Sequence, residues 1–315
     1  MVAAPAQATL CRRTSGDCKR VKILVTGRNG QVARSLAERA DEHGFGKLVF
    51  AARPEFDLEQ PRTMAPLVER LKPDTIVSVA AWTAVDLAEN EPVRARLANA
   101  EAPGELARAA NRIGARLIHI STDYVFDGKK NAPYAESDRT NPQSVYGRTK
   151  LEGEEQVRDA LAEHVILRTA WIYSPFGRNF VKTMLSFADK HDSVRVVEDQ
   201  VGNPTSALDL ADAVFTVLAR WRDGSTDGMG ATYHCAGSGE ANWASLARHA
   251  FRASREAGGP FTRVEGIPSS AWPTKAERPR NSQLDCGLFA ATFGLRLPDW
   301  RGSVDSTVSR LLTPI

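Results

Sequence analysis

A tyrosine and a lysine four positions apart form the pair in this sequence best suited to acid catalysis. Tyr146 and Lys150 lie in the stretch 141–150, NPQSVYGRTK, and this spacing places both side chains on one face of a helix. A free phenol has a pKa near 10, and an adjacent ammonium or the positive ring of a cofactor lowers it. We therefore expect Tyr146 to donate a proton and Lys150 to tune its pKa and bind a cofactor ribose. Such pairs also arise by chance on helix surfaces, so the neighbouring motifs must decide between a catalytic pair and a surface pair.

Two hydroxyl side chains follow a strand-like run upstream of this pair. Ser121 and Thr122 come directly after 116–120, RLIHI, and Asp123 follows them. Ligands of open parallel sheets bind beyond the carboxyl ends of the strands, where a hydroxyl can hydrogen-bond a substrate carbonyl. The alternative is an ordinary polar turn. The combination with the tyrosine–lysine pair favours a catalytic role for Thr122.

A glycine-containing turn near the start of the chain is suited to binding phosphate. The stretch 26–33, TGRNGQVA, has the spacing G-x-x-G-x-x-A between a strand-like and a helical run. Glycine permits the tight turn and the close approach of backbone to a pyrophosphate, and helix N–H groups face the phosphates. The strand–turn–helix context favours a dinucleotide loop over an ordinary turn. The residues expected to contact the cofactor here are Gly27, Asn29, Gly30, Gln31 and Val32.

The type of cofactor follows from the residues after the second strand-like run. An acid that binds the 2′-hydroxyl of NAD is expected roughly 20 residues beyond the loop, where this sequence reads 51–54, AARP. Arg53, together with Arg28 of the glycine loop, favours the 2′-phosphate of NADP(H) instead. NADPH is the expected cofactor and NADH the alternative. The other interpretation of Arg53 is a solvent-facing side chain.

Strand-like and helical runs alternate through the first half of the chain. The expected strands are 22–26, 47–52, 75–80, 116–120 and 165–168, and the expected helices are 31–43, 61–71, 92–113 and 144–162. This alternation predicts βαβ crossovers and a parallel sheet covered on both faces. After Trp171 the pattern loosens, with helices expected at 206–221, 243–257 and 304–312.

These patterns predict an α/β protein with a Rossmann-like doubly wound parallel sheet and a smaller α/β substrate-binding lobe. The NADP(H)-binding domain is expected to span 21–170 plus about 206–235, and the lobe about 171–205 and 236–315. Residues 1–20 are rich in Ala, Arg and Ser and are expected to form a disordered tail, although a transit peptide has a similar composition.

Composition and charge exclude several classes of partner. The net charge is +3 with basic and acidic residues interspersed, whereas nucleic-acid binding favours a clustered basic face. No apolar run approaches the roughly 20 residues that span a bilayer. The four cysteines form no C-x-x-C pair, which favours reduced thiols. We expect a cytoplasmic protein without nucleic-acid or membrane partners.

Taken together, these motifs resemble the extended short-chain dehydrogenase/reductases, whose catalytic triad is Ser/Thr, Tyr and Lys. Further stretches are similar to the branch that reduces nucleotide-linked 4-keto sugars. They are 80–86 (AAWTAVD), 121–128 (STDYVFDG), 168–173 (RTAWIY), 197–205 (VEDQVGNPT) and 278–284 (RPRNSQL). The resemblance runs in order from about Lys22 to about Ser306, nearly the whole chain.

The resemblance implies NADPH-dependent reduction of the C4 ketone of dTDP-4-dehydro-L-rhamnose to dTDP-L-rhamnose, a step in deoxysugar nucleotide and polysaccharide biosynthesis. It assigns Thr122 to orient the carbonyl, Tyr146 to donate the proton and Lys150 to tune Tyr146. Further residues that it implies line the cofactor are Asp57, Leu58, Ala80, Ala81 and Thr83. Residues that it implies contact the substrate are Asp123, Trp171 and Arg278, with core packing the alternative for Trp171 and a structural turn for Arg278.

Three other interpretations remain open at this point. The same fold serves epimerases and other nucleotide-sugar reductases, whereas Tyr124 stands where dehydratases carry a second acid. A non-catalytic, nucleotide-binding regulatory subunit needs no triad, but this chain has one. Some relatives hold Mg²⁺ with acidic residues at a dimer interface. Those acids have no clear counterpart here, so we predict no metal site within the chain and leave a homodimer open.

Overall fold

A six-stranded parallel sheet forms the centre of the computed structural model, which describes residues 21–188 and 190–313. The sheet order is β10-β5-β4-β3-β1-β2. The strands are β1 Ile23–Thr26, β2 Val49–Ala51, β3 Thr75–Ser78, β4 Arg116–Thr122, β5 His164–Thr169 and β10 Ala231–His234. This is the predicted doubly wound fold, so the fold class is confirmed. The expected tail, 1–20, lies outside the described residues.

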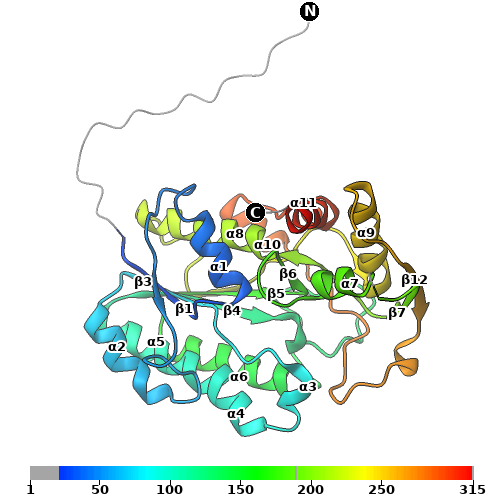
Figure 1. Ribbon diagram of the computed structural model, residues 1–315. Helices are drawn as coiled ribbons and strands as arrows, with labels where there is room; N and C mark the ends of the chain where they lie inside the picture. The colour runs from blue at the N-terminus through cyan, green and yellow to red at the C-terminus, as the bar shows by residue number, and fades with distance from the viewer. Residues whose placement is uncertain (1–20, 189, 314–315) are drawn as a thin grey trace, which may run out of the picture.

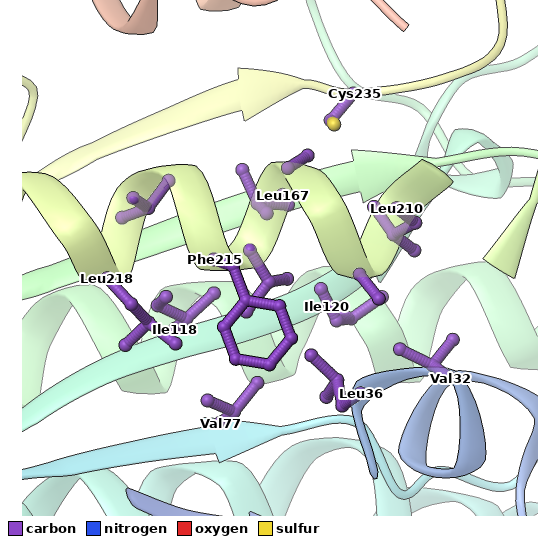
Figure 2. Close-up of a cluster of buried hydrophobic side chains, with 14 of the residues drawn as sticks. Val32, Leu36, Val77, Ile118, Ile120, Leu167, Leu210, Phe215, Leu218 and Cys235 are labelled. Carbon is purple, nitrogen blue, oxygen red and sulfur yellow. The ribbon is translucent and has the colours of Figure 1, made fainter. Parts of the chain in front are cut away.

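Helices cover both faces of the sheet (Figure 1). They are α1 Gln31–Arg39 and α8 Ala207–Arg222 on one face, and α2 Met64–Leu71, α5 Ala102–Ile113 and α6 Val145–Ala160 on the other. Successive strand residues point to opposite faces. Val25 therefore packs with Phe215 of α8, whereas Leu24 packs with Leu106 of α5. Figure 2 shows the first of these cores, where Phe215 lies close to Val77.

The strand order opens a crevice between β1 and β3. The chain leaves β1 toward β2 at one edge of the sheet and leaves β3 toward β4 on the other side, so the two following loops diverge. Thr26 Oγ1 ties the two strand ends together by accepting hydrogen bonds from the Val79 and Ala80 N–H groups, both at 3.0 Å. Ligands of this fold bind at such a switch point.

The helix expected over 92–113 is interrupted by a π-helical turn. The chain forms α4 Pro92–Arg96, the π turn η2 Leu97–Glu101, and then α5. Pro103 has no N–H to donate to the carbonyl of Asn99, four residues earlier, and a missing bond favours a local bulge. The freed Asn99 carbonyl faces Gly153 of α6, where a β-carbon would collide with it. The expectation of one regular helix is therefore wrong at its centre.

A second body of helices and short strands adjoins the carboxyl end of the sheet (Figure 1). Its elements are α7 Phe180–Ala188, α9 Trp243–Glu256, α11 Trp300–Leu312, and the parallel strands β7 Ser193–Val197 and β12 Arg263–Ile267. The short pairs are β6 Ile172–Tyr173 with β9 Thr205–Ser206, and β8 Val201–Gly202 with β11 Ala241–Asn242. Phe251 and Trp300 lie at the centre of its apolar core.

Short helical segments complete the described chain. They are η1 Pro61–Thr63, α3 Val85–Ala88, η3 Asp123–Val125, η4 Ser269–Ala271 and α10 Gly287–Phe293. None of the helices in residues 21–188 and 190–313 is both long and apolar enough to cross a bilayer. The boundaries drawn between cofactor domain and lobe stay a prediction, with β10 lying in the central sheet beside β5.

Candidate active site

A cavity of about 620 Å³ lies at the crevice between the ends of β1, β3 and β4. It brings together most of the residues that the sequence singled out. They are Gly27, Asn29, Gly30, Gln31, Val32, Leu58, Ala80, Ala81, Thr83, Tyr146 and Lys150. Arg28 of the glycine loop and Gly177 and Arg178 of the lobe also line it. The sequence analysis missed the last two, which no motif marked.

The glycine loop has the geometry that phosphate binding requires. Gly27 has φ of 80°, in the left-handed region, and a β-carbon there would lie 3.3 Å from the side chain of Ala80. Gly30 is the N-cap of α1 and makes no side-chain capping bond. The first N–H groups of α1 are thus left for a ligand at the cavity.

The side chain of Gln31 lines the cavity and also makes hydrogen bonds to the protein. Its Oε1 accepts hydrogen bonds from Ser174 Oγ at 2.8 Å and Asn179 Nδ2 at 3.0 Å. Both partners belong to the segment that follows β6, so Gln31 links the glycine loop to the lobe across the cavity.

Tyr146 lies in the first turn of α6, where Ser144 caps the helix by accepting from the Gly147 N–H at 3.1 Å. Its ring meets the ring of Tyr124 edge-on at 5.6 Å. Loss of solvation raises the pKa of Tyr146 to about 12, and a hydrogen bond with Thr122 opposes this rise. The expected lowering of this pKa is therefore not found in the chain alone, because the loss of solvation outweighs the effects that lower it.

Lys150 is buried and is held from the strand side. Its Nζ donates to the Ile120 carbonyl at 2.7 Å and contacts His119 Nε2 at 3.3 Å. Burial lowers the pKa of Lys150 to about 8, and the charge of Glu154 opposes this shift. At this pKa the Lys150 ammonium loses its proton more readily than an ordinary lysine does, and the residue lines the main cavity.

Thr122 and Asp123 lie at the carboxyl end of β4. Thr122 Oγ1 donates to Asp123 Oδ1 at 2.9 Å, and both side chains are buried. Burial raises the pKa of Asp123 to about 6, against hydrogen bonds from Ser282 and Thr122. Among the described residues, the buried Asp123 Oδ2 has no hydrogen-bond partner.

Four other predicted residues lie outside the main cavity. Arg53 Nη2 donates to Asp57 Oδ1 at 3.0 Å and Glu59 Oε1 at 2.9 Å, beside an adjoining cavity of about 370 Å³. Arg53 is thus partly neutralised by two carboxylates, and Asp57 serves as one of them.

Arg278 and Trp171 are likewise engaged with protein side chains. Arg278 Nη2 donates to Asp86 Oδ2 at 2.7 Å, and Arg278 lines a separate cavity of about 570 Å³. Trp171 has φ of 45° and stacks on Trp243 with ring centroids 3.6 Å apart. One indole face is therefore covered by protein.

Asn99, in the π turn, is a site residue that the sequence analysis missed. Its side chain is fully buried. Its Oδ1 accepts from the Trp82 N–H at 2.8 Å, and its Nδ2 donates to the Trp82 carbonyl and to Thr149 Oγ1. Asn99 thus joins the loop after β3 to α6. The only signal in the sequence was Pro103 within a helical run.

Within residues 21–188 and 190–313, no cluster of three or more His, Cys, Asp or Glu side chains is arranged to hold a metal ion. Cys235 is buried and Cys286 half-buried, and both are free thiols; Cys11 and Cys18 lie outside the described residues.

Comparison with known proteins places the chain in a family. The family described as RmlD substrate binding domain matches residues 21–313. The chain belongs to this family. The dTDP-4-dehydrorhamnose reductase of Sinorhizobium fredii is 47% identical over 292 residues, which cover 93% of this chain and 98% of that relative.

Solved structures agree with this membership of the RmlD family. A dTDP-4-dehydrorhamnose reductase from Clostridium acetobutylicum has a TM-score of 0.85 and 35% identity, covering 93% of this chain and 100% of that one. The Bacillus anthracis enzyme of the same name, solved in complex with NADP, has a TM-score of 0.83 and 28% identity, covering 91% and 98%. The family resemblance expected from the sequence is therefore confirmed.

Proposed function

We propose that this protein is an NADPH-dependent reductase that converts the C4 ketone of dTDP-4-dehydro-L-rhamnose into the hydroxyl of dTDP-L-rhamnose. One observation carries the proposal: a single cavity holds the glycine loop, Lys150 and Tyr146. The sugar is inferred from relatives named dTDP-4-dehydrorhamnose reductase, which match almost the full chain.

The cavity walls fit a dinucleotide. The glycine loop offers uncapped N–H groups for a pyrophosphate, and Lys150 offers an ammonium for the nicotinamide ribose. When bound, NADPH supplies the hydride that reduces the ketone carbon. The ketone oxygen receives a proton from Tyr146, so the carbonyl gains one hydride and one proton in total. The raised pKa of Tyr146 keeps that proton in place at neutral pH.

Thr122 and Asp123 would orient the substrate. The Thr122 hydroxyl lies at the strand end beside Tyr146 and would position the C4 oxygen. The unpartnered Oδ2 of buried Asp123 would accept from a sugar hydroxyl. Trp171 would present its remaining face to the sugar, and Arg278 would approach the nucleotide diphosphate from the cavity that it lines.

Arg28 is the better candidate for the 2′-phosphate of NADPH, although the sequence put Arg53 first. Arg53 is committed to Asp57 and Glu59. Arg28 lines both the main cavity and a neighbouring one of about 410 Å³, and it forms no ion pair within the described ranges. NADH remains the alternative donor, and the cytoplasmic location and the homodimer also stay proposals.

The decisive test is turnover with defined sugars. The purified protein is mixed with NADPH and dTDP-4-dehydro-L-rhamnose, NADPH oxidation is followed by absorbance, and the sugar product is identified by NMR. We expect one NADPH oxidised per dTDP-L-rhamnose formed, and weaker turnover of UDP- and GDP-linked 4-keto sugars. Epimerised product without net NADPH oxidation would identify an epimerase instead. Binding of nucleotide without any turnover would support the regulatory-subunit alternative.

A further inference from the structure

His119 occupies a fully buried position in the middle of the central sheet, directly before the residues of the active site. It lies on β4 and is paired in register with Ser78 of β3. Its Nδ1 lies 3.2 Å from Ser78 Oγ, and its Nε2 lies 3.3 Å from Lys150 Nζ. A buried chain of three polar groups thus ends at the ammonium that faces the cavity.

The donors and acceptors of this chain allow one arrangement. An ammonium can only donate, so His119 Nε2 must accept with its lone pair. The ring proton then sits on Nδ1, where Ser78 Oγ accepts it. Burial and the charge of Lys150 hold the pKa of His119 well below its ordinary value, so the imidazole is neutral and able to accept.

We propose that His119 is a positioning residue for Lys150: its imidazole, together with the Ile120 carbonyl, fixes the ammonium at the cavity and keeps it protonated. The inference rests on the proposed function only in that Lys150 there binds the cofactor. His119 acts through Lys150 and does not line the main cavity itself.

Other charged and titratable groups lie around Ser78, His119 and Lys150, and the test must distinguish their effects from the effect of His119. Glu154, one turn further along α6, favours the charged form of Lys150, but its carboxylate is engaged by Arg168 of β5 at 2.7 Å. Tyr146 lies one turn before Lys150 on α6. The charge of His164 also lowers the pKa of His119, and His164 lies at the amino end of β5. None of these groups changes when His119 alone is replaced.

A matched pair of amide variants isolates the contact to Lys150. In His119→Gln, Oε1 takes the position of Nε2 and keeps an acceptor for Lys150. In His119→Asn, the shorter amide reaches only toward Ser78. Both replacements bury a neutral amide, so a merely structural role would affect the two proteins alike.

The titration of Lys150 is measured by NMR on protein labelled with ¹³C at the lysine Cε, with the signal assigned from its loss in Lys150→Met. We expect the midpoint to fall by about one pH unit in His119→Asn, because losing a charge-assisted hydrogen bond costs roughly that much. His119→Gln should stay within a few tenths of a unit of the wild type. The affinity for NADPH should fall about fivefold near pH 8 in His119→Asn only, because the protonated fraction of Lys150 falls by that factor.

Equal midpoints in the two amide variants would overturn the inference. If neither variant folds, Ser78→Ala decides, because it leaves His119 in place and removes the acceptor for Nδ1. A downward shift of the Lys150 midpoint in Ser78→Ala supports the inference, and an unchanged midpoint overturns it. If the midpoints behave as expected but the wild type does not bind NADPH, the proposed function fails while the contact to Lys150 stands.

Discussion

At the scale of single residues, the hydrogen-bond partners of Lys150 do not follow from its spacing to Tyr146. The four-residue interval predicts a shared helix face with Tyr146 and nothing about which atoms meet the ammonium. Those atoms come from β4, because Ile120 and His119 lie beside α6 in space. The result is a proton donor with a raised pKa next to a cation with a lowered one.

Replacing Tyr146 by Phe removes the proposed proton donor and keeps the ring. We expect kcat to fall by roughly 10²–10⁴-fold, with the Kd for NADPH and the urea unfolding midpoint close to the wild type. Tyr124→Phe is the matched control, because it removes the hydroxyl of the ring packed edge-on against Tyr146. A kcat for Tyr146→Phe equal to that of Tyr124→Phe would remove Tyr146 from the mechanism.

The two arginines near the cofactor cavity should differ in their effect on cofactor preference. Arg28→Ala should lower the ratio of kcat/KM for NADPH to that for NADH by roughly 10–100-fold, the value of one charge-assisted contact to phosphate. Arg53→Ala should change this ratio much less, because its guanidinium already binds two carboxylates. The reverse order would return the 2′-phosphate to Arg53.

The buried ammonium of Lys150 predicts a pH dependence of stability. The pKa of Lys150 falls from 10.5 to about 8 on folding, so the unfolded chain binds more protons between these values. The unfolding free energy of the wild type should therefore rise relative to Lys150→Met as the pH increases through this window, by up to about 3 kcal/mol. Urea unfolding at pH 7.5 and at higher pH measures the difference, and a gap independent of pH would contradict it.

At the scale of elements, the position of α6 depends on its close approach to the π turn. Gly153 of α6 lies against the Asn99 carbonyl, which Pro103 leaves without a helical donor. Asn99 in turn binds the backbone of Trp82 and the side chain of Thr149. The π turn, Gly153 and Asn99 together set the distance between α6 and the loop after β3.

Gly153→Ala tests this approach. The added methyl meets the backbone of Asn99 and Ala100 and cannot be accommodated by a rotamer change, so we expect a loss of about 1–3 kcal/mol in the free energy of unfolding. Gly302→Ala in α11 is the matched control. A β-carbon at Gly302 has open space around it, so this change should stabilise the protein by about 0.5–1 kcal/mol. Urea denaturation compares the two, and equal effects would show that α6 is loosely packed.

At the scale of the whole molecule, contacts between distant parts of the sequence close the site. The segment between η4 and α10 returns to α3, where Asp86 accepts from Arg278 Nη2 at 2.7 Å and from the Ala276 N–H at 3.0 Å. On the other side, Gln31 binds Ser174. These contacts join segments of the second body to the loops that surround the main cavity.

Asp86→Asn should weaken substrate binding without unfolding the protein. The Asp86 side chain is nearly half exposed, and exposed ion pairs contribute about 0–1 kcal/mol, so the melting temperature should barely change. We expect the KM for the sugar to rise several-fold with the KM for NADPH unchanged, because Arg278 loses the partner that orients it. Steady-state kinetics in both substrates measure this, and a parallel rise in both KM values would argue against a role confined to the sugar side.

Site residues can be predicted from the sequence where they belong to local patterns, and cannot where their contacts come from other segments of the chain. The glycine loop, the hydroxyl of Thr122 and the tyrosine–lysine pair are local patterns, and the cavity unites Gly27, Tyr146 and Lys150 as expected. Arg178 and Asn99 escaped notice because their roles depend on segments far away in the chain. Arg53 was favoured for a phosphate because the carboxylates that bind it become its neighbours only through the turn after β2.

The sequence by itself determined the doubly wound sheet, since strand and helix periodicities and glycine turns are local properties that repeat along the chain. It also determined the types and the order of the residues proposed for catalysis. The tertiary structure alone decided the state of those residues. Burial raises the pKa of Asp123, and the register of β3 with β4 places Ser78 and His119 behind Lys150. Both effects depend on desolvation and on contacts between strands, which arise only when the whole sheet is assembled.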